Sequence, residues 1–156
     1  MKISSINYLM SIAIDEAQAA FKEDEVPVGA VISNSHGDII STGHNTKEQN
    51  QNACNHAELL AITKASKQLK NWRLTDCDIY VTLEPCPMCL SAILQSRIKN
   101  VYFGAYDLKG GSFSLGYNMH KDKRLNHSLN VFGGFKHIEC SKILSDFFKL
   151  KRKQYK

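Results

Sequence analysis

The chain has 156 residues, and its 43% hydrophobic and 22% charged content is typical of a folded globular domain and argues against disorder. The apolar runs fall short of the roughly 20 residues that cross a bilayer, so we expect no membrane span and a cytoplasmic location, where thiols stay reduced. The formal net charge is +5, and residues 149–156 (KLKRKQYK) hold five basic and no acidic residues, so the other 15 Lys and Arg balance 15 Asp and Glu.

The predicted elements alternate between helices and strands in one domain over residues 1–156. Apolar residues recur at helical spacing over about 6–22, and β-branched residues predict a buried strand over 26–33. The turn residues at 35–38 predict a hairpin whose second strand follows directly, and the polar stretch 46–55 predicts a loop.

The second part of the chain continues the alternation. The expected elements are a helix over 56–69, a strand over 78–83, a helix over 90–97, strands at 101–103 and near 130–132, and a last helix over 139–151 that buries Ile143, Leu144, Phe147 and Phe148. This last helix begins a basic C-terminal segment, 139–156. Strands that alternate with helices predict an α/β layered domain with helices on the sheet faces.

Two short motifs carry the chemistry: His56-Ala57-Glu58 and Pro85-Cys86-Pro87-Met88-Cys89. Cys86 and Cys89 lie three residues apart at a predicted helix start, so their sulfurs project from one face and the helix N-terminus favours the thiolates. His56 begins another predicted helix. If both helix starts meet at one sheet edge, His56, Cys86 and Cys89 converge on one zinc ion and leave its fourth position to water, as in catalytic zinc sites.

Glu58 follows the histidine by two residues and therefore lies on a different face of the helix. Its carboxylate can approach the metal without binding it, which suits an acid–base catalyst. A first-turn acid that only stabilises a helix N-terminus is the alternative, and the two cysteines favour the catalytic interpretation.

H-x-E followed by P-C-x-x-C is the known signature of zinc nucleobase deaminases. The chain resembles the cytidine/deoxycytidylate deaminase superfamily and, within it, the bacterial tRNA adenosine deaminases. The similar stretches span nearly the whole chain in the family's order: 25–32 (EVPVGAVI), 56–62 (HAELLAI), 80–89 (YVTLEPCPMC), 96–111 (SRIKNVYFGAYDLKGG), 125–127 (LNH) and 144–152 (LSDFFKLKR). This resemblance implies a three-layer α-β-α, cytidine-deaminase-like domain, with a mixed five-stranded sheet and helices on both faces.

The resemblance also implies a reaction and its residues. The family converts the wobble adenosine of a tRNA anticodon stem-loop to inosine, as a homodimer with one Zn²⁺ per subunit. His56, Cys86 and Cys89 correspond to zinc ligands, Glu58 to the proton shuttle and Asn45 to a base-contacting asparagine. The implied RNA contacts are Asp107, Lys109, Lys149, Lys151 and Arg152. On charge alone, the basic tail is equally well a solvated terminus.

The remaining cysteines have no expected catalytic role. Residues 52–55 (NACN) depart from the family pattern, and Cys54 is either a fourth metal ligand or, as we expect, a small buried thiol. Cys77 and Cys140 are interpreted as packing residues.

Three alternative functions stay open. Pro87-Met88 also occurs in guanine deaminases, so a deaminase of a free base or nucleoside shares the metal site but needs no basic arm. A thioredoxin-like oxidoreductase built on Cys86 and Cys89 leaves His56 without a role. An RNA-binding module with a structural zinc site requires a fourth ligand.

Overall fold

A mixed five-stranded sheet forms the centre of the computed structural model, which describes residues 2–154. The elements in chain order are α1 (Ile3–Lys22), β1 (Gly29–Asn34), β2 (Ile39–His44), α2 (Ala57–Leu69), β3 (Cys77–Leu83), α3 (Pro87–Gln95), β4 (Asn100–Ala105), the 3₁₀ helix η1 (Met119–Lys121), β5 (Asn130–Gly133) and α4 (His137–Gln154).

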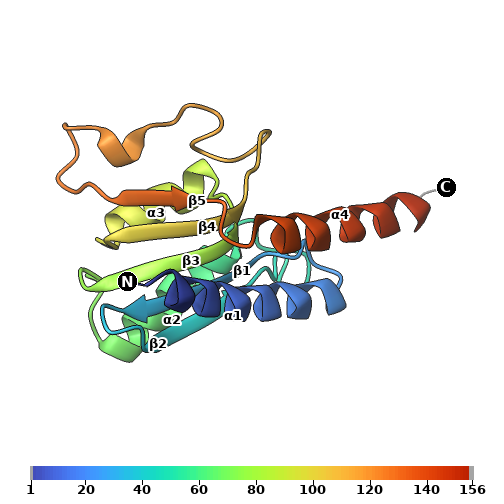
Figure 1. The fold of residues 1–156 in the computed structure, drawn as a ribbon, viewed down its shortest axis with the longest axis horizontal. Coiled ribbons are helices and arrows are strands. Elements are labelled where there is room, and N and C mark those ends of the chain that lie inside the picture. Colours follow the sequence, from blue (N-terminus) through green and yellow to red (C-terminus); the bar gives the residue numbers. More distant parts are fainter. Residues whose placement is uncertain (1, 155–156) are drawn as a thin grey trace.

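The strands lie in the order β2-β1-β3-β4-β5 (Figure 1). β1 is antiparallel to both β2 and β3, whereas β3, β4 and β5 are parallel. The register pairs Gly29 with His44 and Leu83 with Ala105. One edge of the sheet therefore collects the start of β1 and the carboxyl ends of the other four strands, which is the edge where the predicted site residues follow their strands.

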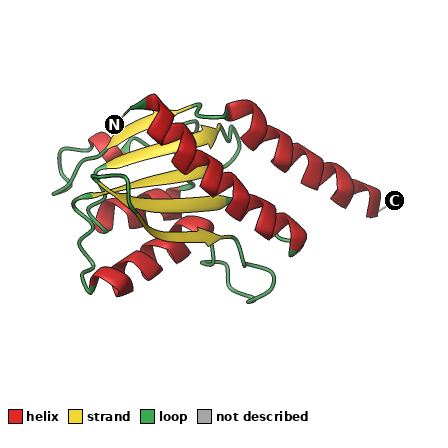
Figure 2. Cartoon of the chain, turned by 60° about the horizontal axis from the view of Figure 1, so that its bottom comes forward, coloured by secondary structure: helices red, strands yellow, loops and turns green. Residues whose placement is uncertain are grey.

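Helices cover both faces of the sheet, as the three-layer prediction requires (Figure 2). Alternate residues of each strand face opposite cores. Ile32 packs with α2 and α3 in one core, and its neighbour Val31 packs with α1 and Cys140 of α4 in the other. The expected packing roles of Cys77 and Cys140 are confirmed, because both are buried.

Stacked aromatic rings tie the parallel strands together on the α1 side of the sheet. Tyr80, Tyr102 and Phe132 occupy paired positions on β3, β4 and β5. Their ring centroids are 4.9 Å apart for the first pair and 5.1 Å for the second, and both pairs are stacked. Such cross-strand pairs stabilise a sheet beyond simple burial.

Several details differ from the sequence-based expectations. The helix expected over 90–97 spans Pro87–Gln95, because Pro87 fits the first turn of a helix. β1 begins at Gly29 and not at Val26, because the Val28 N–H bonds back to the Val26 carbonyl and Pro27 has no N–H for a ladder. Phe148 is not on the buried face of α4: it is 43% exposed, whereas Phe147 is 5% exposed. The helix buries a narrower stripe than its four apolar residues predict.

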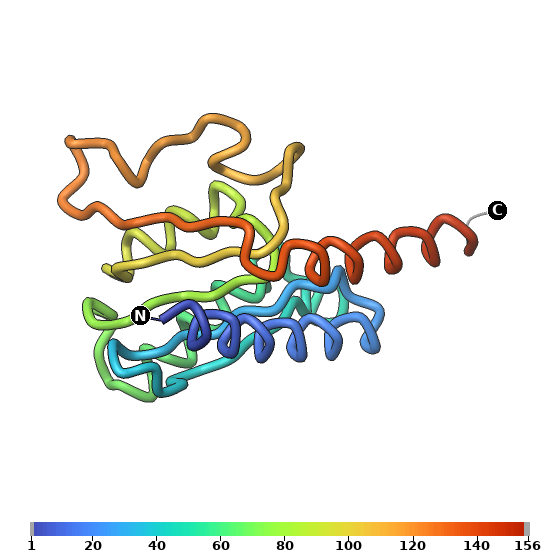
Figure 3. The backbone as a smooth tube through the Cα atoms, viewed as in Figure 1, coloured from blue at the N-terminus to red at the C-terminus, as the bar shows by residue number. Residues whose placement is uncertain are grey.

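The last turns of α4 extend past the body of the molecule on the side where β5 ends (Figures 1 and 3). The helix carries Lys151, Arg152 and Lys153 in its last turn. Neither α4 nor any other helix within residues 2–154 combines the length and apolar character that crossing a membrane requires.

Candidate active site

His56, Cys86 and Cys89 meet at the sheet edge where β3 ends. His56 is the N-cap residue of α2, Cys86 is the N-cap residue of α3, and Cys89 lies in the first turn of α3. His56 Nδ1 lies 3.7 Å from Cys86 Sγ and 3.5 Å from Cys89 Sγ. The two helices follow β2 and β3, and both of these strands pair with β1, so the sheet itself brings the two helix starts together.

This donor set fits a zinc ion. One ligand atom from each of His56, Cys86 and Cys89 lies within 4.8 Å of the others, and this is the one such cluster of His, Cys, Asp or Glu found within residues 2–154. Two sulfurs and one imidazole nitrogen are typical zinc donors, and three protein ligands define an open site. Cys54 is not in the cluster and is exposed, so the expected buried thiol is wrong and Cys54 does not close the site as a fourth ligand.

The thiols of Cys86 and Cys89 have pKa values shifted in opposite directions. The hydrogen bond from Cys89 holds the pKa of Cys86 down at about 4, and the same contact raises the pKa of Cys89. The contact with Cys86 also raises the pKa of His56. One thiolate therefore exists at neutral pH, which is the form that binds a metal.

Glu58 lies in the first turn of α2 and is 4% exposed. Burial raises the pKa of its carboxyl to about 7, and the negative charge at Cys86 acts in the same direction. A carboxyl that titrates near neutral pH can both accept and donate a proton under working conditions. The structure thus brings Glu58 to the same helix start as His56.

Asn45 directly follows β2 and is buried beside the start of α2. Its Oδ1 accepts a 2.9 Å hydrogen bond from the Ala57 N–H, and its Nδ2 donates to the Val26 carbonyl at 3.0 Å. This contact caps α2 in place of His56, whose own side chain makes no capping bond, so the imidazole can turn toward the cysteines. The amide keeps a second N–H and a second lone pair for another partner.

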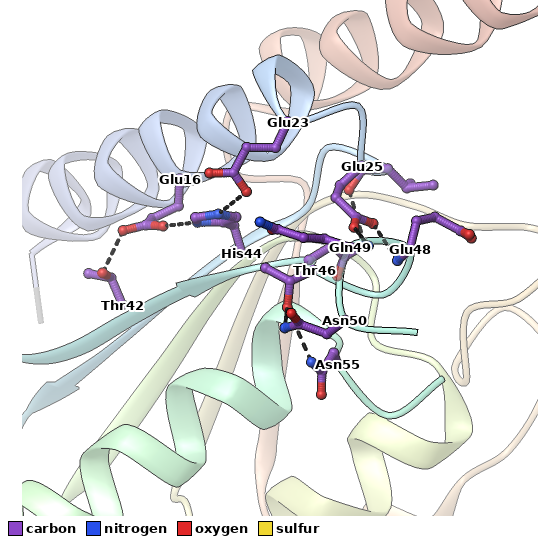
Figure 4. A network of polar contacts seen from close by, with 12 residues as sticks. Glu16, Glu23, Glu25, Thr42, His44, Thr46, Glu48, Gln49, Asn50 and Asn55 are labelled. Atoms are coloured by element: carbon purple, nitrogen blue, oxygen red, sulfur yellow. Dashed lines mark hydrogen bonds and ion pairs between the residues drawn. The ribbon is translucent and has the colours of Figure 1, made fainter. Parts of the chain in front are cut away.

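The loop between β2 and α2 is held by a carboxylate that the sequence did not single out. Glu25 is 2% exposed, and its two oxygens accept hydrogen bonds from the Glu48 N–H at 3.1 Å and the Gln49 N–H at 2.7 Å (Figure 4). Within the loop, Thr46 Oγ1 accepts from the amide groups of Asn50 and Asn55. The signal in the sequence is a glutamate next to a buried strand, with no basic residue beside it.

Two predicted RNA contacts lie in the loop after β4. The Asp107 carboxylate accepts hydrogen bonds from the Lys109 and Gly110 N–H groups, so it shapes its own loop, and the Lys109 side chain is exposed. A second buried carboxylate, Glu84, accepts from the Asp107 N–H. Glu84 was also missed by the sequence analysis.

The other three predicted RNA contacts, Lys149, Lys151 and Arg152, lie in the last turns of α4. Lys151 pairs with Asp24 beyond the end of α1 and lies over the Phe147 ring. Lys149 and Arg152 are exposed and form no hydrogen bond or ion pair with the described residues. Lys151 therefore anchors the helix to the end of α1, whereas Lys149 and Arg152 face solvent.

Comparison with known proteins gives matches over most of the chain. Residues 3–105 match the family described as the cytidine and deoxycytidylate deaminase zinc-binding region. The tRNA-specific adenosine deaminase of Bacillus subtilis is 45% identical over 147 residues, which cover 94% of this chain and 91% of that protein.

Two solved structures bear on the substrate. One comes from a study of A-to-I editing by tRNA:A34 deaminases at the wobble position of transfer RNA. It superposes with a TM-score of 0.83 at 37% identity and covers 88% of this chain and 99% of its own. The guanine deaminase of Bacillus subtilis has a TM-score of 0.61 at 35% identity and covers 70% of this chain and 69% of its own. The similarity to the tRNA enzyme is thus the more extensive of the two.

Proposed function

Because the chain belongs to the cytidine and deoxycytidylate deaminase family, and within it to the tRNA-specific adenosine deaminases, we propose that it hydrolyses the wobble adenosine of a tRNA anticodon to inosine and ammonia. The observation that carries this proposal is the cluster of His56, Cys86 and Cys89 with Glu58 buried at the same helix start.

The protein is a zinc enzyme, and His56, Cys86 and Cys89 are the residues that would hold the ion. When bound, zinc lowers the pKa of a coordinated water from about 15.7 toward about 7, which supplies the nucleophile at neutral pH. The three ligands come from the starts of two helices that the sheet fixes in place, so the site needs no large rearrangement to form.

Glu58 moves the protons of the reaction. Its carboxylate accepts a proton from the attacking water as the C6–O bond forms and passes this proton to the ring nitrogen of adenine. It then moves the second proton, from the newly added hydroxyl, to the amine as the C6–N bond breaks and ammonia leaves. The pKa of about 7 produced by burial matches this double role. Proton transfer of this kind contributes about 10² to 10⁴-fold in rate.

Asn45 orients the base. Its free N–H and free lone pair can donate to and accept from the edge of one purine, while its other two bonds fix it to Val26 and Ala57. The same side chain thus caps the helix that carries Glu58 and holds the substrate, which couples base position to the catalytic carboxyl.

An anticodon loop suits this site physically. Its bases are unpaired, so they can be splayed out and read on their edges without breaking a duplex. The exposed Lys109, Lys149 and Arg152 supply phosphate contacts that do not depend on sequence. Asp107 and Lys151 contribute by holding the loop and the helix that present these cations.

The active form is a homodimer in the cytoplasm, and residues 1–156 form a single domain in each subunit. Support for the dimer comes from apolar side chains near the site that a monomer leaves exposed: Leu108 is 79% exposed, Leu115 47% and Tyr117 51%. A dimer with RNA near the subunit junction covers such side chains. Light scattering of the purified protein tests this point by its mass.

A deamination assay of the zinc-loaded protein tests the function. The substrates are an anticodon stem-loop with a wobble adenosine, the same stem-loop with a wobble guanosine, free adenosine and free guanine. We expect inosine in the first stem-loop and no turnover of the free compounds. Turnover of free guanine alone would keep the zinc chemistry and replace the substrate, as the similarity to guanine deaminase allows.

A further inference from the structure

Glu84 is a buried acid that the reaction does not use. It directly follows β3, is 2% exposed, and its N–H extends the strand pairing by bonding to the Ala105 carbonyl. Its Oε2 accepts from the Asp107 N–H at 2.9 Å and from Ser114 Oγ at 2.6 Å, and its Oε1 accepts from the Ser114 N–H at 2.7 Å. All three donors are neutral and come from one loop, residues 107–114.

The loop wraps closely around this carboxylate. A Cβ on Gly111 would lie 2.3 Å from Glu84 Cδ, so a larger residue there would push the carboxyl group away from its three donors. The next residue, Ser112, donates its N–H to the Pro85 carbonyl at 2.9 Å. The loop is thereby fixed to the two residues that immediately precede the zinc-binding Cys86.

The outer side of the same loop carries Lys109, which is exposed to solvent. The Asp107 carboxylate, held in place by the bond between its own N–H and Glu84, accepts from the Lys109 and Gly110 N–H groups. The direction in which Lys109 leaves the loop therefore depends on Asp107, and the position of Asp107 depends on Glu84.

We propose that Glu84 is a positioning residue for RNA binding: it clamps loop 107–114 beside the zinc site so that Lys109 meets the anticodon backbone. The proposal rests on the function argued above. A buried carboxyl group that accepts three hydrogen bonds from one loop resists displacement, because its oxygens would lose these partners if the loop moved away. The loop needs such a clamp because it lies outside the sheet and the helices.

The test variant is Glu84→Gln, which keeps size but places an amide NH₂ against a loop N–H. Asp78→Asn is the matched control: Asp78 is a buried acid at the other end of β3, and it accepts from Asn100 Nδ2 at 2.6 Å. Ser114→Ala is a milder variant that removes only the hydroxyl donor, for use if Glu84→Gln does not fold.

We measure zinc content, hydrogen exchange of the Asp107 and Ser114 amides, and kcat and KM on the anticodon stem-loop. For Glu84→Gln we expect full zinc content, faster exchange of both amides, a KM raised about tenfold and a kcat within about threefold of wild type, because the effect falls on binding. Asp78→Asn should leave KM unchanged. Ser114→Ala should raise KM by about twofold to threefold, since it removes one of the three donors.

Combining Glu84→Gln with Lys109→Gln separates positioning from a general loss of stability. If Glu84 acts through Lys109, the double variant has a KM no higher than the worse single variant; two independent effects multiply instead. The proposal is overturned if the KM effects of Glu84→Gln and Lys109→Gln multiply in the double variant. It is also overturned if folded Glu84→Gln has unchanged amide exchange or an unchanged KM. Failure of the wild-type protein to deaminate the stem-loop would instead overturn the proposed function, and the exchange data would still decide whether Glu84 clamps the loop.

Discussion

Four carboxylates are buried within residues 2–154: Glu25, Glu58, Asp78 and Glu84. Glu25 and Glu84 each accept backbone N–H groups from a loop, and Asp78 accepts from a neighbouring asparagine. Glu58 has its own backbone N–H and Cys89 as partners, and burial dominates its pKa. Glu25 and Glu84 each hold a loop through its backbone N–H groups, whereas Glu58 lies at the helix start beside His56 and the cysteines. The partners thus distinguish the two loop-holding acids from Glu58, the proposed proton carrier.

Replacing Glu58 with glutamine should abolish turnover and leave zinc in place. The amide is nearly isosteric but cannot accept and release a proton, so we expect kcat to fall by about 10² to 10⁴-fold. Zinc content by atomic absorption and stem-loop binding by anisotropy should match wild type.

Cys86→Ser is the comparison for this variant, because it removes a ligand and should lose both zinc and activity. Cys54→Ser should lose neither, since Cys54 is exposed and outside the cluster. Zinc loss in Glu58→Gln would show that the carboxyl holds the metal and does not shuttle protons.

His44 forms a second polar group, between two glutamates of the α1 region. Its Nδ1 lies 2.6 Å from Glu16 Oε2 and its Nε2 lies 3.1 Å from Glu23 Oε2 (Figure 4). Burial alone would lower the pKa of His44, but the hydrogen bonds to Glu16 and Glu23 outweigh it and raise the pKa above 6.5. For Glu16, burial is likewise outweighed, by hydrogen bonds from Thr42 and His44, and its pKa falls below 4.5.

His44→Ala should therefore cost stability in a defined pH window. Because the pKa of His44 is raised, its protonated form stabilises the fold below about pH 6.5, and this stabilisation is lost as pH rises through the folded-state pKa. Because the pKa of Glu16 is lowered, the stabilisation is also lost as pH falls below about 4.5. We expect a decrease of about 1 kcal/mol in the free energy of unfolding at pH 5.5 and a smaller one at pH 9, measured by urea unfolding. His36→Ala, in the exposed hairpin turn, is the control. Equal decreases at both pH values would contradict the assignment.

At the scale of elements, hydrophobic periodicity predicts most of the helices and strands correctly. The exceptions have local causes. Val26 to Val28 have strand-forming residues, but the Val28 N–H turns back to Val26 and the strand starts at Gly29. Phe148 continues an apolar stripe, yet 43% of it stays exposed and its ring packs on Phe147 of the same helix. Periodicity shows which face is apolar and does not show how far the partner extends.

Phe147 and Phe148 offer a matched test of this point. Phe147 packs edge-to-face on Phe21 with ring centroids 5.5 Å apart, and joins α4 to α1. We expect Phe147→Ala to lower the free energy of unfolding by about 3 to 5 kcal/mol, as for a fully buried phenylalanine. Phe148→Ala should cost under about 1 kcal/mol, because 43% of the residue is exposed. Equal decreases in urea unfolding would show that α4 packs differently.

At the scale of the molecule, the zinc cluster was predictable from sequence and its supports were not. His56, Cys86 and Cys89 stand out because few other roles need those residue types at helix starts. Glu25, Glu84 and the capping bond of Asn45 depend on loops that approach from distant parts of the chain. Such interactions leave no periodic signal, so only the folded structure identifies them.

The charge distribution gives the last prediction. We expect changing Lys149, Arg152 and Lys153 together to glutamine to weaken stem-loop binding at low salt. The slope of log Kd against log salt should fall by about 0.7 for each phosphate that the variant no longer neutralises. All three side chains are exposed, whereas Lys151 is kept because it pairs with Asp24.

The control for this variant removes the same charge from the opposite sheet edge, by changing Lys67, Lys70 and Lys99 to glutamine. These exposed residues lie at the end of α2 and just before β4. Equal weakening in both variants would mean that net charge, and not the position of the tail, attracts the RNA.

The exposed segment 70–73 divides the proposed catalytic residues into two groups. Asn45, His56 and Glu58 precede this segment, and Cys86 and Cys89 follow it. Two polypeptides separated at this segment would each hold an incomplete catalytic set, joined by five residue pairs between β1 and β3 and by the cores on both faces. Inosine formation would then require association of the two fragments. The fold is therefore suited to a split enzyme whose activity measures that association.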